Sequence, residues 1–189
     1  MVKAGIELFR RKGYIATTVD EICEEAGVTK GAFFHHYASK EALGEACLKE
    51  WDCMTAAMEE MAPFHAVPDP LARLLACIDF YIGLFENPGL LKSCLAGTTV
   101  QEVSETHPIL REAAHACFVS AESRLKAMLD EACEARNLKL DTASLAALWM
   151  AAIQGALVLC KASGDESVIG ATLKHVRAYI ASLFLDSRT

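Results

Sequence analysis

The chain has 189 residues, of which 53% are hydrophobic and 23% are charged, and its net charge is −7. The apolar content excludes a disordered chain, and the acidic balance argues against a protein that coats nucleic acid without sequence preference. The acidity is uneven, because the first 50 residues carry a net charge of −1 and the remainder −6. Local DNA contact by a near-neutral N-terminal region therefore remains open.

Eight cysteines are scattered along the chain, and no two of them have CxxC spacing. Most fall in apolar helical patterns, which favours buried, reduced thiols over a disulfide framework or a zinc site. The apolar run 143–160 is close to the length of a membrane span, but it is rich in alanine and contains Gln154, so we interpret it as a buried helix. Lys3 and Glu7 interrupt the first apolar run, and no secretion signal is recognised. We expect a cytoplasmic protein with no metal, no cofactor and no membrane contact.

In chain order, the first helix is predicted from the start of the chain to Lys12, where Gly13 ends it. Thr18 and Glu21 form a capping-box pattern that begins a second helix, which ends near Ala26.

Gly27 can adopt left-handed backbone, and Thr29 is a natural N-cap for a third helix over residues 30–36. Ser39 then caps a fourth helix that reaches about Met61. A helix as short as the third buries too little surface to be stable alone, so the flanking helices must hold it for presentation. A helix-turn-helix presents its second helix to the DNA major groove in this way.

The fourth helix has an apolar face and a length of ~30 Å, enough to join a DNA-reading region to a separate body. The face is formed by Leu43, Cys47, Trp51, Met54, Met58 and Met61. Its methionines have two interpretations, an ordinary core or an adaptable ligand pocket.

The rest of the chain also has helical patterning, with no strand alternation and no repeat. Asp69-Pro70 begins a helix that Asn87-Pro88-Gly89 breaks. The further predictions are a short helix over 90–95, a loop through 97–99, a helix from about 108 to 135, a helix from Asp141 to Gly164, and a last helix that ends near Phe184. The fold class is therefore all-α.

The N-terminal quarter of the chain resembles the DNA-binding region of the TetR family of bacterial transcriptional regulators. The resemblance rests on Phe9, Gly13-Tyr14, Thr17-Thr18 and the segment GVTKGAFFHHYASKEAL from Gly27 to Leu43. It implies a three-helix helix-turn-helix domain over residues 1–45, followed by a helical ligand-binding and dimerisation domain over 46–189. It also implies a regulator that responds to a ligand, more often a repressor than an activator. The family's first helix usually starts several residues earlier, so we expect some DNA-backbone contacts to be absent from this sequence.

Ten residues are candidates for contact with double-stranded operator DNA. Hydroxyls at helix starts can hold phosphates, lysine can donate to guanine, and an alanine methyl group can touch thymine. The resemblance adds a lysine at the start of the fourth helix as a phosphate contact. The candidates are Thr17, Thr18, Thr29, Lys30, Ala32, Phe34, His35, His36, Tyr37 and Lys40. Phe34 stands where the family commonly has tyrosine and Tyr37 where it commonly has phenylalanine, so the bases that are read remain open.

A two-fold homodimer is predicted through the last two helices, because they carry more apolar surface than one body of this size covers. The predicted interface residues are Ala152, Ile153, Ala156, Leu173, Val176 and Ile180. A dimer also pairs two reading helices on a near-palindromic site.

A small apolar or aromatic effector is predicted to bind beside the fourth helix. The predicted lining residues are Trp51, Met58, Phe80, Tyr81, Cys94, Phe118 and Trp149. Cys94 has two interpretations. It is either one more small buried residue or a thiol that Lys92 activates, and its segment loosely resembles one in a TetR subgroup that includes electrophile sensors.

The alternative function is an all-helical enzyme or carrier that merely contains a helix-turn-helix. The sequence offers it no phosphate-binding loop, metal-ligand set or pair of catalytic carboxylates. We therefore predict a regulator and not an enzyme.

Overall fold

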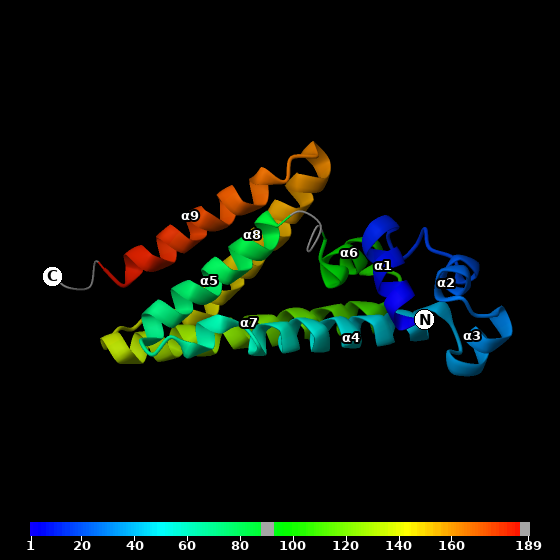
Figure 1. Ribbon diagram of the computed structural model, residues 1–189, viewed down its shortest axis with the longest axis horizontal. Coiled ribbons are helices and arrows are strands. Elements are labelled where there is room, and N and C mark those ends of the chain that lie inside the picture. Colours follow the sequence, from blue (N-terminus) through cyan, green and yellow to red (C-terminus); the bar gives the residue numbers. More distant parts are fainter. Residues whose placement is uncertain (88–92, 186–189) are drawn as a thin grey trace. The chain divides into compact units, whose positions relative to one another are not determined.

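The computed structural model describes residues 1–87 and 93–185, and these residues form helices and no strand (Figure 1). The predicted all-α class is confirmed. The chain divides into two compact units. The first unit comprises residues 1–57 and 93–120, and the second comprises residues 58–87 and 121–185.

The first unit is built from short helices, most of one long helix and the N-terminal part of another. They are α1 (Val2–Lys12), α2 (Val19–Ala26), α3 (Lys30–His36), α6 (Leu95–Val103) and parts of α4 (Lys40–Glu60) and α7 (Pro108–Arg136). Phe9, Ile22, Phe33 and Leu43 are at most 1% exposed and form its core. Phe33 is the one buried residue of α3, so this helix is attached by a single aromatic side chain.

Three hydroxyl caps begin α2, α3 and α4, as the sequence predicts. Thr18, Thr29 and Ser39 each accept a hydrogen bond from the backbone N–H three residues further on. Gly27, between α2 and α3, has a φ of 64°, which favours glycine because it has no Cβ. These local signals fix the helix boundaries of the predicted helix-turn-helix.

α6 differs from its prediction. Residues 88–92 lie outside the described part of the chain, and Ser93 and Cys94, inside the predicted short helix, are not helical. The predicted loop over 97–99 is wrong, because these residues lie within α6. Leu95, Thr99 and Val103 are buried four residues apart, and this buried face stabilises a helix in a glycine- and threonine-containing sequence of low intrinsic propensity.

The apolar face of α4 is covered only in part. Leu43, Cys47 and Trp51 are buried, as predicted, but Met54 is 50% exposed and Met61 is 80% exposed. The interpretation of these two methionines as core residues is therefore wrong, and their role in a ligand pocket stays a prediction. Periodicity shows which side chains share a helix face, and it does not show how far neighbouring helices extend over that face.

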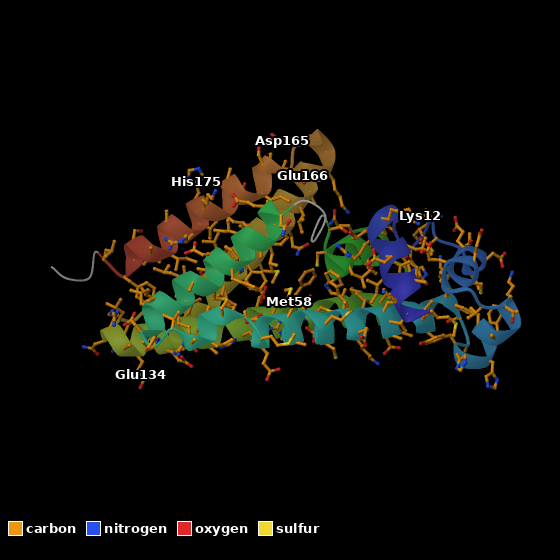
Figure 2. The ribbon with its side chains drawn as sticks, in the orientation of Figure 1. Lys12, Met58, Glu134, Asp165, Glu166 and His175 are labelled. Atoms are coloured by element: carbon orange, nitrogen blue, oxygen red, sulfur yellow. The ribbon has the colours of Figure 1, made fainter. Side chains whose placement is uncertain are left out.

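The second unit contains η1 (Pro63–Ala66), α5 (Pro70–Glu86), α8 (Thr142–Ser163), α9 (Ser167–Leu183) and the C-terminal parts of α4 and α7. It is organised around the packing of α5 and α8 against α9. Asp69 caps α5 through the Ala72 N–H, and Asp141 caps α8, as predicted. Figure 2 shows Asp165 in the connection between α8 and α9, and His175 pointing outward from α9.

Four of the predicted dimer-interface residues lie inside the second unit. Ile153, Ala156, Leu173 and Ile180 are at most 7% exposed, so their prediction as interface residues is wrong. They are the apolar stripes with which α8 and α9 pack within one chain, and helical periodicity alone does not distinguish such stripes from an interface.

The outer faces of α8 and α9 carry a different set of apolar residues. Leu148 is 40% exposed, Leu159 is 57% exposed and Tyr179 is 50% exposed. A Cβ atom added at Gly155 would meet no atom within 4 Å, so the backbone of α8 is open to close approach there.

α8 is long and apolar enough to cross a membrane by length and composition alone, with a mean hydropathy of 1.9 over its most apolar window. One face of α8 is buried within the second unit through Leu145, Trp149 and Leu157. This pattern is typical of a core helix, as we interpret it from the sequence.

Candidate nucleic-acid interface

α3 exposes its polar and aromatic side chains while Phe33 anchors it. Lys30, Phe34, His35 and His36 are exposed, and Phe34 is 51% exposed despite its apolar ring. Such a helix offers exposed side chains to an external partner, which is the property that a recognition helix requires.

The other candidates on this surface differ in accessibility. Thr18 and Thr29 are exposed at the starts of α2 and α3, and Ala32 and Tyr37 are partly exposed. Free backbone N–H groups at a helix start favour phosphate oxygens, so the two threonines lie where such contacts are made.

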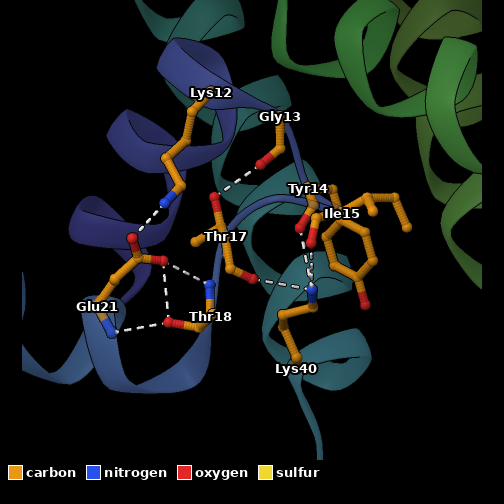
Figure 3. Close-up of polar contacts among 8 residues, drawn as sticks. All are labelled: Lys12, Gly13, Tyr14, Ile15, Thr17, Thr18, Glu21 and Lys40. Carbon is orange, nitrogen blue, oxygen red and sulfur yellow. Dashed lines mark hydrogen bonds and ion pairs between the residues drawn. The ribbon is translucent and has the colours of Figure 1, made fainter.

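Thr17 is a correction to the sequence analysis. Its side chain is fully buried, its hydroxyl donates to the Gly13 carbonyl over 2.6 Å, and its own N–H donates to the Tyr14 carbonyl (Figure 3). Neither group is available to a phosphate, so the prediction of a DNA contact by Thr17 is wrong. The residue closes the loop between α1 and α2.

Lys40 holds the same loop from the start of α4. Its ammonium group donates to the carbonyl oxygens of Tyr14 and Thr17 over 3.0 and 2.9 Å, and it lies 4.3 Å from the centre of the Tyr14 ring (Figure 3). Burial lowers the pKa of Lys40, and the negative charge of Glu102 opposes this effect. The sequence does not predict this backbone role. Phosphate contact by Lys40 stays a prediction.

Lys30 is paired with Asp20 across the turn. Its Nζ lies 2.8 Å from Asp20 Oδ1, and the hydrogen bond to Asp20 is the main cause that raises the pKa of Lys30. Both side chains are more than half exposed, and solvent screens an exposed pair of this kind, so a DNA base can replace Asp20 at small cost. The sequence around Asp20 does not predict its ion pair with Lys30, because this contact depends on the angle between α2 and α3.

Glu21 joins the start of α2 to the end of α1. Its carboxylate contacts the Lys12 ammonium and accepts from the N–H and hydroxyl groups of Thr18 (Figure 3). The Lys12 hydrogen bond, followed by those of Thr18, lowers the pKa of Glu21 to about 2. Two acidic residues of α2 therefore form ion pairs with Lys12 and Lys30, and a count of charges along the sequence does not show this pairing.

Comparison with known families decides the assignment. Residues 1–47 match the family model of bacterial regulatory proteins of the tetR family, and residues 70–176 match a tetracyclin repressor-like C-terminal domain. The chain belongs to the TetR family. The predicted family is confirmed, and its members are DNA-binding transcriptional regulators that are not enzymes.

Known TetR-family proteins resemble this chain over most of its length. It is 28% identical to the transcriptional regulator AcuR of Cereibacter sphaeroides over 163 residues, which cover 85% of the chain and 74% of AcuR. It is 27% identical to the HTH-type transcriptional repressor DhaR of Mycobacterium sp. strain GP1 over 164 residues, covering 85% of the chain and 80% of DhaR. A cysteine mutant of the regulator CifR, solved with 26-bp double-strand operator DNA, has the same fold at a TM-score of 0.79 and 13% identity, covering 94% of this chain and 93% of that one.

The predicted effector residues of this TetR-family protein divide between the two units. Trp51, Cys94 and Phe118 belong to the first unit, and Met58, Phe80, Tyr81 and Trp149 belong to the second. The predicted pocket thus stays a prediction.

In the first unit, Cys94 is the N-cap of α6. It is partly exposed, and its Sγ accepts a hydrogen bond from the Gly97 N–H over 3.5 Å. Lys92, which the sequence predicts to activate this thiol, lies outside the described residues. Trp51 lies beneath the Arg10 guanidinium, 4.8 Å from ring centre to Cζ.

In the second unit, Phe80, Tyr81 and Trp149 belong to an aromatic cluster with one buried carboxylate. The rings of Tyr81 and Trp149 are 6.3 Å apart. The Tyr81 hydroxyl donates to Glu59 over 2.6 Å, and Arg124 Nε donates to the same carboxylate oxygen over 2.9 Å. Burial, reinforced by the Glu59 charge, raises the pKa of Tyr81. Neither Glu59 nor Arg124 belongs to a sequence pattern that predicts this pairing, because the two residues meet only in the folded chain.

Proposed function

We propose that this TetR-family protein is a homodimeric transcriptional repressor that binds a near-palindromic operator through α3 and leaves it when a small apolar or reactive molecule binds. The observation that most strongly supports the proposal is the exposure of α3. This helix has seven residues and is anchored by Phe33, and its other large side chains are exposed. Two similar proteins support this proposal, because DhaR is named a transcriptional repressor and CifR was solved with operator DNA.

In the proposed complex, the first turns of α2 and α3 meet the DNA backbone, and α3 enters the major groove. Thr18 and Thr29 bind phosphates, Lys30 leaves Asp20 for a guanine edge, and the Ala32 methyl group touches thymine. His35, His36, Phe34 and Tyr37 lie further along α3 or just after it and contact flanking bases or backbone.

The proposed dimer uses the outer faces of α8 and α9. Leu148, Leu159 and Tyr179 expose apolar surface, and Gly155 leaves room for a partner helix. Of the residues predicted from the sequence, Ala152 and Val176 are partly exposed and remain in the proposed interface. Two copies then place two α3 helices on successive major grooves of one DNA face.

Gel retardation tests the DNA-binding proposal. The probe is a DNA fragment flanking the protein's own gene, with excess unrelated duplex as competitor. We expect a retarded band for the parent and for Lys139→Ala, which removes an exposed lysine of the second unit, and a weaker band for Lys30→Ala. Equal retardation of the flanking and unrelated fragments contradicts sequence-specific binding.

Release by a reactive molecule is proposed to act at Cys94, because its partly exposed sulfur lies at the start of α6 within hydrogen-bond reach of a backbone amide. N-ethylmaleimide is the probe. Cys53 is exposed and serves as the matched control, since the probe can reach it as well. The proposal expects DNA release for the parent and for Cys53→Ser but not for Cys94→Ser. If Cys94→Ser is released equally, a reversible apolar effector becomes the better explanation.

A further inference from the structure

Glu102, near the C-terminal end of α6, contacts the backbone of the helix-turn-helix. Its Oε2 accepts a hydrogen bond from the Ile15 N–H over 2.9 Å. Ile15 lies in the loop between α1 and α2, and the two residues are 87 positions apart in sequence. The N–H of Ile15 has no partner in the adjacent helices, so this carboxylate replaces water on a loop amide.

Gly13 provides the space for this carboxylate. A Cβ atom at Gly13 would lie 1.8 Å from Glu102 Oε1, and the φ of 92° at this position also disfavours a side chain. Because Glu102 is a flexible side chain, a residue larger than glycine would displace its carboxylate from Ile15.

The loop is thus held from two sides by opposite charges. The Glu102 carboxylate accepts from the N–H of Ile15, while the Lys40 ammonium donates to the carbonyls of Tyr14 and Thr17. The negative charge of Glu102 also raises the pKa of Lys40, against the larger effect of burial. The ring of Tyr14 also packs edge-on against His107, at 5.3 Å between centroids.

The N-terminal end of α6 is attached to α1. Arg10 Nε donates to the Ser93 carbonyl, and the Ser93 hydroxyl donates to the Arg10 carbonyl, each over 3.2 Å. Ser93 is buried and directly precedes Cys94, the N-cap of α6. The helix therefore has reciprocal polar contacts with α1 at its start and with the following loop near its end.

We propose that Glu102 is a positioning residue for DNA binding, which fixes the loop before Thr18 and thereby the orientation of α2 and α3. This inference rests on the proposed DNA-binding function. Thr18 directly follows the loop and begins α2, so a shift of Ile15 moves the helix start that is proposed to meet phosphate. Glu102 does not itself touch DNA in this proposal.

The test uses a duplex that the parent protein enriches from a pool of random-sequence DNA. Affinity for this duplex is measured for the parent, Glu102→Ala, Glu102→Gln and Glu105→Ala. Glu105 is an exposed carboxylate three residues away, so its removal matches the charge change without touching the loop. Each variant is assayed at a temperature at which its circular-dichroism spectrum equals that of the parent, which separates positioning from loss of fold.

We expect Glu102→Ala to weaken binding about fivefold, since it removes one hydrogen bond from a charged acceptor, and Glu105→Ala to bind as the parent does. Glu102→Gln should recover most of the affinity, because its amide oxygen can still accept from Ile15. Amide hydrogen exchange at Ile15, followed by NMR, should be faster in Glu102→Ala than in the parent and intermediate in Glu102→Gln.

Several outcomes overturn the proposal. They are unchanged affinity in Glu102→Ala, equal weakening in the Gln and Ala variants, and Ile15 exchange that does not respond to residue 102. If the parent enriches no sequence from the pool, the proposed DNA-binding function fails, and this result is distinct from a failure of the role of Glu102.

Discussion

The two units use polar side chains in different ways. In the first unit, beside the ion pairs that Lys12 and Lys30 make with α2, charged and hydroxyl groups bind backbone atoms of a loop. Lys40, Glu102 and Thr17 do so around residues 13–17. In the second unit, charged groups mostly pair with one another between helices. Arg177 binds Asp79 there with two hydrogen bonds, and Lys174 binds Glu86.

This difference has a physical reason and a consequence. The helices of the second unit are already placed by apolar packing, so an exposed ion pair between them adds little stability. The loop of the first unit is anchored by one buried ring, that of Tyr14, and directed hydrogen bonds fix the backbone around it up to the start of α2. Polar substitutions should therefore change DNA binding in the first unit, whereas the sensitive surface positions of the second unit should be apolar.

The largest expected effect comes from an exposed apolar face of the second unit. Gly155→Arg places a charge in the proposed dimer interface and should yield a monomer whose DNA affinity falls at least about a hundredfold, because the two reading helices are no longer linked. Gly83→Arg is the matched control, since a Cβ at Gly83 also meets no atom within 4 Å. Sedimentation and gel retardation measure both effects. A Gly155→Arg dimer of parental affinity contradicts this interface.

The next effect concerns base recognition in the first unit. Lys30→Ala should cost about 1–3 kcal/mol on the specific duplex and weaken base preference. Asp20→Asn, which frees Lys30, should instead raise affinity for unrelated DNA and lower the ratio of specific to unrelated binding. Titrations against both duplexes measure the ratio. If Lys30→Ala leaves it unchanged, α3 does not read bases through this lysine.

The third prediction compares two arginines of the second unit. Arg124→Ala leaves the Glu59 carboxylate, which is 6% exposed, with one donor fewer and should destabilise the fold by about 2 kcal/mol. Arg177→Ala removes a more exposed pair and should cost less than ~1 kcal/mol. Urea unfolding measures both free energies. Equal losses would show that burial does not set the strength of these pairs.

The smallest effect is the pH dependence of the capping box in the first unit. Hydrogen bonds from Lys12 and Thr18 lower the pKa of Glu21 from 4.5 to about 2. Its stabilising contribution is therefore complete above pH 4.5 and is lost as the pH falls towards about 2. Between these values the melting temperature of the parent should fall more than that of Glu21→Gln, while Glu25→Gln on the same helix should follow the parent. A parent and Glu21→Gln that differ by the same amount at every pH contradict this.

Local signals in the sequence predict the helix boundaries well. Thr18, Thr29, Ser39 and Gly27 act within three or four residues, so their roles need no knowledge of the fold. The family resemblance has the same basis, because it too rests on a short continuous segment.

The sequence does not predict contacts between segments that are distant along the chain. The bonds of Glu102 to Ile15 and of Lys40 to the loop carbonyls depend on tertiary packing. For the same reason, helical periodicity identifies Ile153 and Leu173 as apolar-face residues but assigns them to a dimer interface when they belong to the protomer core. Helical periodicity shows which residues share one face of a helix, and only the folded structure shows which element packs against that face.

Hydroxyl-radical footprinting of the parent on its enriched duplex tests the central claim, that paired α3 helices read specific DNA. The account predicts two protected regions separated by one helical turn of about 10 base pairs, or a multiple of it, and related by a two-fold axis. It also predicts that Lys30→Ala loses both regions together at a concentration at which the parent protects them. Uniform protection along the duplex, or an unchanged footprint with Lys30→Ala, would contradict it.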